Sequence, residues 1–142
     1  MDILVYDYIF EGMKSYNEKI GKPHGNSVLS SEPFMGKKEK EVSFPITIIK
    51  EIRNTAIRGF NSCHERLASV GYRVDIFAKT KGNVLKQKIA REIAQKMDEF
   101  MSDFVGLLRV SYNVSDLEND GTIYHIIMTY EGTLHENRRT FF

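Results

Sequence analysis

The feature that most constrains the fold is an amphipathic helical pattern at residues 84–104. Apolar residues recur there at three- and four-residue steps, which places them on one face of an α-helix and the charged residues elsewhere. The apolar stripe consists of Leu85, Ile89, Ile93, Met97, Phe100 or Met101, and Phe104. Residues 70–80 before it and residues 108–114 after it alternate as strands do. The pattern predicts a strand, a helix and a strand, with Gly106 ending the helix.

Further elements extend this unit in both directions along the chain. A second helical stripe over residues 2–20 ends at Gly21 and Pro23. The remaining predicted elements are strands at residues 44–54, 122–131 and 137–142. Two helices cannot cover both faces of such a sheet, and its open edges invite pairing with another chain. We therefore expect one α+β domain over residues 1–142, with a mixed, mainly antiparallel sheet of four to five strands and two main helices packed on one face.

Residues 22–43 are the least regular part of the sequence. Pro and Gly recur there, which predicts a long projecting loop or hairpin, with residues 27–34 as one extended arm. Lys37, Lys38 and Lys40 form a small basic cluster, although neighbouring glutamates neutralise much of its charge. A loop of this length in a small domain is typically either disordered or functional. The three lysines are therefore candidates for an assembly interface.

Composition limits the classes of function. Apolar residues make up 42% of the chain and charged residues 27%, which is typical of a globular domain with one core. The formal net charge of +1 provides no global field for nucleic acid or an anionic membrane, so we expect no sequence-specific nucleic-acid binding. Apolar runs fall far short of the roughly 20 residues that cross a bilayer, and the N-terminal residues carry no basic leader. The single Cys63 cannot form an internal disulfide, which fits a soluble intracellular protein.

The sequence shows no arrangement typical of a catalytic, cofactor or metal site. The histidines lack the three- or four-residue spacing that places two ligands on one helix face; they are His24, His64, His125 and His135. Cys63 adjoins His64, but adjacent residues seldom present a nucleophile and its base to one another. Asp75 would suit a metal-dependent nuclease sheet, but no Glu-x-Lys arrangement lies beside it. We predict no catalytic residues, no cofactor and no metal.

Several segments together resemble the tail terminator proteins of long-tailed bacteriophages, also called tail completion or head-tail joining proteins. The resemblance covers about 100 residues and rests on FPITIIKEIRN at 44–54, YRVDIFAK at 72–79, the helix with Ile89, Ile93 and Met97, DGTIYH at 120–125 and MTYEG at 128–132. It implies a non-catalytic subunit of a hexameric ring at the head-proximal end of the tail tube. Such a ring stops tube growth and docks to the head connector or stopper protein. The resemblance also implies assembly in the bacterial host cytoplasm and a final place in the virion tail or neck.

The interface residues are predicted from chemistry alone, because the resemblance supplies no interface motif. Arg73 and Asp75 lie on the polar side of the strand at 70–80. Arg138 and Arg139 precede Phe141 and Phe142, two rings that either anchor a partner or close the core as an edge strand. Two alternatives stay open, namely a monomeric phage neck adaptor or assembly chaperone and a metal-dependent nuclease.

Overall fold

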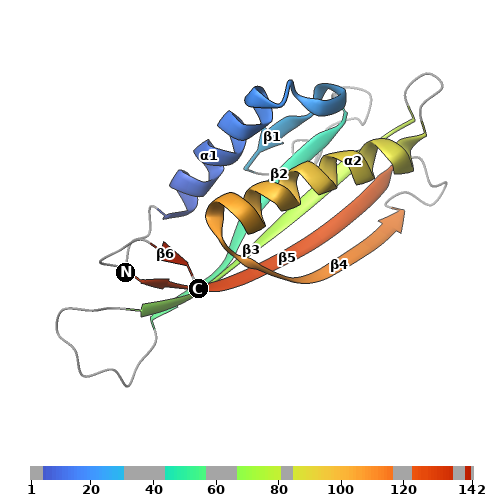
Figure 1. The fold of residues 1–142 in the computed structure, drawn as a ribbon. Coiled ribbons are helices and arrows are strands. Elements are labelled where there is room, and N and C mark those ends of the chain that lie inside the picture. The colour runs from blue at the N-terminus through green and yellow to red at the C-terminus, as the bar shows by residue number, and fades with distance from the viewer. Residues whose placement is uncertain are drawn as a thin grey trace.

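A computed structural model describes residues 5–30, 44–56, 67–80, 85–116, 123–135 and 140–141. The helical elements are α1 (Val5–Lys19), a short 3-10 turn (Pro23–Gly25), α2 (Lys86–Glu99) and a π-helical turn (Phe100–Val105) that continues α2. The strands are β1 (Ser27–Leu29), β2 (Ile46–Ala56), β3 (Leu67–Ala78), β4 (Leu108–Asp116), β5 (Tyr124–His135) and β6 (Thr140–Phe141), as Figure 1 shows.

The strands form one mixed sheet in the order β1-β2-β3-β5-β4. β1 runs parallel to β2, and the pairs β2–β3, β3–β5 and β4–β5 are antiparallel. The short β6 pairs with the end of β5. This confirms the predicted α+β class and its mainly antiparallel sheet. Of the extended arm expected at residues 27–34, Ser27–Leu29 forms the strand β1 parallel to β2, and residues 31–34 lie outside the described residues.

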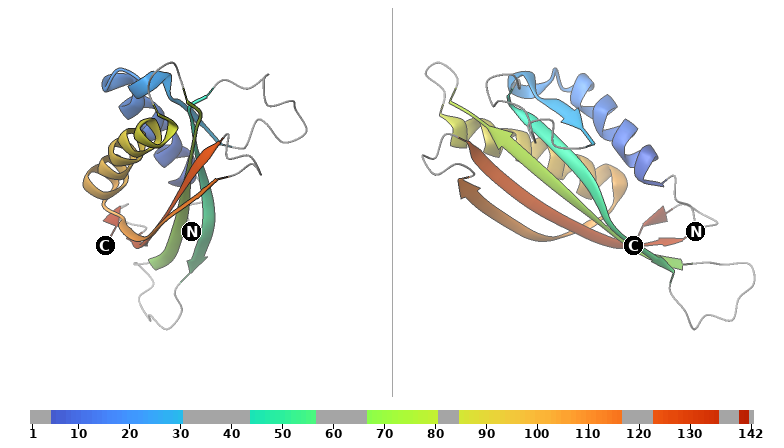
Figure 2. Two further views of the ribbon diagram at one scale, coloured as in Figure 1. Left: turned by 90° about the vertical axis from the view of Figure 1, so that its right-hand side faces the viewer. Right: turned by 180° about the vertical axis from the view of Figure 1, so that it is seen from behind.

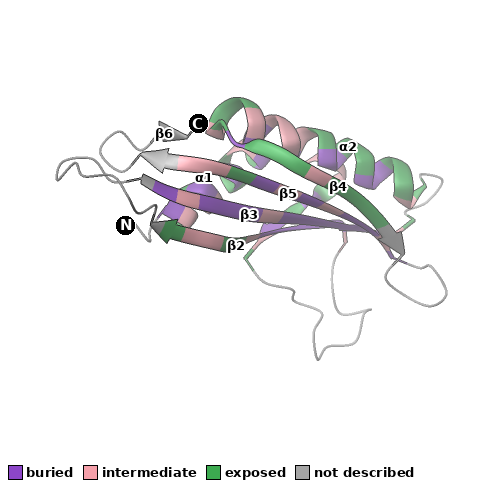
Figure 3. Ribbon diagram, turned by 90° about the horizontal axis from the view of Figure 1, so that it is seen from below, coloured by how far each residue is buried: buried purple, intermediate pink, exposed green. Residues whose placement is uncertain are grey.

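Both helices lie on the same side of the sheet (Figure 2). Figure 3 shows the sheet from its other side, with the helices behind it. α1 lies over β1 and β2, whereas α2 lies over β3 and β5. One main core fills the space between the layers. Its largest members are Ile9 and Met13 from α1, Ile89, Ile93 and Met97 from α2, Tyr72 and Ile76 from β3, and Met128 and Tyr130 from β5. Because each such side chain contributes about 1.5–3 kcal/mol on burial, this layer supplies most of the driving force for folding.

The helical stripes explain which faces are buried. The stripe of α2 is confirmed from Ile89 to Met101, but its two predicted ends are exposed, Leu85 by 63% and Phe104 by 70%. Leu85 precedes the first turn of α2 in an extended conformation and so lies off the helical stripe. Phe104 lies in the π-helical turn, whose wider turn takes it off the line that a regular α-helix would follow. Gly106 then ends the turn at φ 89°, a left-handed conformation that favours glycine.

The alternation along β3 is also confirmed, with a difference on its second face. Val70, Tyr72, Val74, Ile76 and Ala78 face the helices, as the sequence predicts. The other face was expected to be largely polar and open to water or partners, yet Asp75 and Phe77 are both buried there. Phe77 belongs to a second, smaller cluster on that side, with Ile46, Ile48 and Ile123.

Candidate assembly surfaces

β4 is the outermost long strand of the described sheet, and its apolar side chains are unusually exposed. Leu108, Val110, Tyr112 and Val114 are between 41% and 64% exposed. Alternation alone predicts that such a strand buries one apolar face, but α2 covers β3 and β5 and leaves β4 at the margin (Figure 3). A register shift between Arg109 and Ser111 also leaves Val110 without a partner on β5. The result is an edge strand that combines free backbone groups with apolar surface.

Basic side chains flank the helix-facing side of this edge. The guanidinium of Arg109 lies 5.7 Å from the ring centroid of Tyr112. Burial raises the pKa of Tyr112, the nearby Tyr124 adds to this, and the positive charges of Arg91 and Arg109 oppose it. Asp98 lies 3.4 Å from Arg109 and also accepts a hydrogen bond from the Tyr130 hydroxyl at 2.6 Å. Asp98 therefore ties the start of β4 to α2.

The opposite edge of the sheet, formed by α1 and β2, is protected. β1 pairs with Ile46–Ile48 of β2, and the Tyr6 hydroxyl donates a 2.6 Å hydrogen bond to the carbonyl of Ile49. The exposed carboxylates of Asp7 and Glu51 lie near one another at this edge. Partial burial raises the pKa of Glu51, a hydrogen bond from Asn54 lowers it, and the negative charge of Asp7 raises it further. This edge therefore carries two neighbouring carboxylates, and β1 and Tyr6 cover the part of β2 from Ile46 to Ile49.

A groove of about 910 Å³ lies between α1 and the π-helical turn. Its apolar lining includes Tyr8, Gly12, Tyr16, Phe100, Phe104 and Val105. The ring of Tyr16 lies 5.6 Å from that of Phe100 and 5.2 Å from that of Phe104. A Cβ at Gly12 would come within 3.0 Å of the Phe100 ring, so glycine is what lets α1 approach this closely. Tyr8, which is 77% exposed, and Phe104 give this surface the composition of a protein-binding groove.

Arg73, Asp75 and His125 form a polar cluster on the sheet face away from the helices. Oδ1 of the buried Asp75 accepts hydrogen bonds from Nε of Arg73 at 2.9 Å and from Nε2 of His125 at 2.8 Å. His125 also stacks on Phe77, with ring centroids 4.2 Å apart. A carboxylate held in this way balances the charge of Arg73 and ties β3 to β5. The cluster supports the sheet, and its only side chain with substantial exposure is Arg73.

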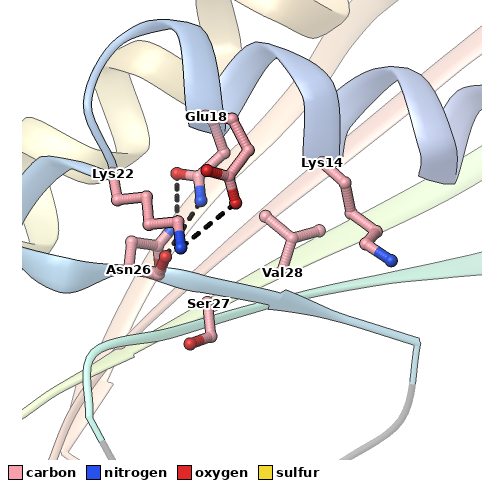
Figure 4. A pocket seen from close by; sticks show the side chains of 7 residues that line it. Lys14, Glu18, Lys22, Asn26, Ser27 and Val28 are labelled. Carbon is pink, nitrogen blue, oxygen red and sulfur yellow. Dashed lines mark hydrogen bonds and ion pairs between the residues drawn. The ribbon is translucent and has the colours of Figure 1, made fainter.

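A smaller pocket of about 190 Å³ lies between the end of α1 and β1 (Figure 4). Beneath it, the side chains of Asn17 and Asn26 bond to each other, and the Thr47 hydroxyl donates to Asn26 at 2.9 Å. Lys22 and Glu18 form an ion pair of 3.2 Å at its rim. These polar groups form hydrogen bonds and an ion pair with one another, and the hydrogen bonds join α1 to β1 and β2.

The predicted interface residues fall in different places. Arg73 and Asp75 meet in the cluster on β3, where Asp75 is buried and Arg73 is the part that reaches solvent. Phe141 belongs to β6, whose backbone pairs with β5. The others lie outside the described residues: Lys37, Lys38, Lys40, Arg138, Arg139 and Phe142. His125 is buried on β5 and hydrogen-bonded to Asp75.

Neither the exposed edge of β4 nor the aromatic groove was predicted from the sequence. The sequence does show that Leu108, Val110, Tyr112 and Val114 alternate with polar residues. It does not show that no helix covers this strand. The groove depends on the π-helical turn, for which the sequence carries no comparable signal.

Comparisons with known proteins add no assignment, since no protein-family model matches the chain and no curated protein matches it significantly. Across the described ranges, no three His, Cys, Asp or Glu side chains gather into a group that could hold a metal ion. No helix in the described part of the chain has the length and apolar character needed to span a membrane.

Proposed function

We propose that this chain is a structural subunit that assembles with copies of itself into a ring, in the manner of a phage tail terminator. In that role the ring, a hexamer by the resemblance, closes the head-proximal end of the tail tube and docks to the head connector or stopper protein. The observation that carries the proposal is the exposed apolar edge strand β4.

An edge strand of nine residues with exposed apolar side chains is a liability in a protein that stays alone. Natural proteins usually protect such an edge with charges, proline or a covering segment. Here β1 and Tyr6 cover β2 from Ile46 to Ile49 and leave Ile52 half-exposed, whereas β4 presents Val110, Tyr112 and Val114 together. The difference favours a contact in which β4 is covered by another subunit.

A ring subunit at the end of a tube also needs surfaces for partners above and below it. The aromatic groove around Tyr8, Tyr16 and Phe104 is separate from β4 and is lined by α1 and the π-helical turn. Its apolar floor and exposed rings suit a segment of the tail tube protein or of the connector. The same groove favours the alternative of a monomeric neck adaptor or assembly chaperone, which would bind one partner there and form no ring.

The arrangement around Asp75 does not favour the nuclease alternative. A divalent ion at a nuclease site needs several carboxylate or histidine ligands around it. Oδ1 of Asp75 is shared between Arg73 and His125, Oδ2 is buried without a hydrogen-bond partner, and the described residues bring no group of three acidic, His or Cys side chains together there. We therefore expect no cleavage of supercoiled DNA by the purified protein with magnesium or manganese.

The proposal is tested by light scattering coupled to size-exclusion chromatography over a range of protein concentrations. We expect a discrete multiple of the 16.4 kDa chain mass. The double variant Val110→Glu/Val114→Glu places two charges on the β4 edge and should shift the protein towards the monomer. The matched control Tyr8→Glu/Phe104→Glu changes two exposed apolar residues in the groove and should assemble as the unmodified chain does. A monomer throughout, or equal assembly of both variants, would contradict the proposal.

A further inference from the structure

The two edges of the sheet carry opposite local charge. At the β4 edge, Arg91 and Arg109 both act on Tyr112, and Asp98 balances one of these two positive charges. At the α1–β2 edge, Asp7 and Glu51 lie close enough for each to act electrostatically on the same group, the Tyr6 hydroxyl. One edge therefore carries two arginines beside apolar residues, and the other carries a pair of carboxylates at the start of α1, with Lys14 two helical turns further along beside β1.

Helix geometry explains why Arg91 belongs to the β4 edge. Arg91 and Asp98 are seven residues apart on α2, two turns of helix, so their side chains leave the same flank. Asp98 on that flank reaches Arg109 of β4 and Tyr130 of β5. The other flank of α2 faces the 3-10 turn and α1, where Glu92 contacts His24 of the turn and Glu99 accepts a hydrogen bond from Tyr16 of α1. The two arginines thus share the helix-facing side of the β4 edge with Tyr112 and Val114.

The contact between α1 and β2 holds Asp7 and Glu51 at the edge of the sheet opposite to β4. The hydrogen bond from Tyr6 to the Ile49 carbonyl fixes the first turn of α1 against β2. Asp7 comes directly after Tyr6, and Glu51 comes two residues after Ile49. Like charges placed together cost free energy in the isolated subunit, and a cationic partner would remove that cost.

We propose that the β4 edge of one copy packs against the α1–β2 edge of the next copy, with Arg91 and Arg109 facing Asp7 and Glu51. This inference rests on the proposed self-assembly and specifies which surfaces meet. Because the two surfaces lie at opposite edges of the same chain, the contact is head-to-tail and repeats from copy to copy, as a closed ring requires. A two-fold contact between two β4 strands would instead bring the arginines of both copies together, which like-charge repulsion disfavours.

Charge reversal tests this pairing directly. Arg91→Glu/Arg109→Glu makes the β4 edge acidic, and Asp7→Lys/Glu51→Lys makes the α1–β2 edge basic. Each double variant alone should weaken association by about tenfold or more, because like charges then meet at every contact. Mixing the two variants should restore assembly, since each copy then meets a neighbour of opposite charge. The quadruple variant, with both edges reversed, should also assemble.

A control separates general charge effects from this contact. Lys19→Glu/Lys88→Glu reverses two exposed charges away from both edges and should leave association unchanged. Sedimentation velocity at matched ionic strength gives the association constant of each protein, and circular dichroism confirms that each variant is folded. If the unmodified chain assembles but the mixture and the quadruple variant show no rescue, the pairing is wrong while self-assembly stands. If the unmodified chain stays monomeric, both proposals fail.

Discussion

Tyr72 and Tyr130 form a matched pair for testing how the core is stabilised. They lie directly opposite each other on β3 and β5, both are fully buried, and both face the helices. Their hydroxyls differ. The Tyr130 hydroxyl donates a 2.6 Å hydrogen bond to Asp98, whereas the buried Tyr72 hydroxyl has no hydrogen-bond partner within the described part of the structure.

Replacing each tyrosine by phenylalanine should therefore change stability in opposite directions. Tyr130→Phe removes a hydrogen bond to a charged acceptor, which contributes about 1.5–3 kcal/mol. The lower end applies, because Asp98 keeps its ion pair with Arg109. Tyr72→Phe removes a buried hydroxyl that is unsatisfied, so the free energy of unfolding should stay equal or rise by about 1 kcal/mol. The two variants should thus differ by roughly 1.5–2.5 kcal/mol.

Urea denaturation followed by circular dichroism measures both free energies of unfolding. The decrease of the free energy of unfolding per molar urea should be the same for both variants. The experiment is best done at a low protein concentration, so that association does not add to stability. Equal losses in the two variants would show that the Tyr72 hydroxyl has a partner of similar strength, which would refute the reasoning.

Three further predictions concern charge. Asp75→Asn should lower the free energy of unfolding by about 2–3 kcal/mol, because Arg73 and His125 lose a charged hydrogen-bond acceptor. Hydrogen bonds from water to Arg73 offset part of this loss. A loss below about 0.5 kcal/mol in urea denaturation would count against the prediction. Burial, and then the hydrogen bond to Asp98, raise the pKa of Tyr130. The Tyr130 hydroxyl therefore loses its proton at a lower pH in the unfolded chain than in the folded protein, and the free energy of unfolding should fall above about pH 10. The fall should be less steep in Tyr130→Phe, and identical pH profiles of the two proteins would contradict this. Association measured by sedimentation should weaken with added salt, since exposed charge pairs are screened over about 10 Å at 0.1 M; salt-independent association would argue that the edge charges play no part.

Much of the fold follows from periodicity in the sequence. The stripe of α2 and the alternation of β3 each predict an element and the face that it buries. Apolar residues repeat about every 3.6 residues on a helix face and every two residues on a strand face, and these two faces pack against each other in the main core. The parallel pairing of β1 was missed, since three residues carry too little pattern to give a direction. The exposure of Phe104 was missed as well, because a single π-helical turn changes the facing of a side chain without altering the sequence period.

The candidate surfaces were less predictable than the fold. Asp75 was chosen as an interface residue because it lies on the polar side of β3, but its burial depends on a bond to His125, fifty residues away in sequence. No local pattern reveals a partner at that distance. The opposite charges of the two sheet edges also depend on topology, because Arg91 and Arg109 come together only when α2 lies beside β4.

Amide hydrogen exchange of β4 tests most directly whether another copy covers this strand. Exchange is followed by mass spectrometry on peptides that contain residues 108–116, at protein concentrations below and above the onset of association. We expect these amides to become protected as the protein associates, together with those of the α1–β2 edge, while peptides from the groove around Phe104 stay unchanged. Association that leaves the exchange of β4 unaltered would contradict the role given to this edge.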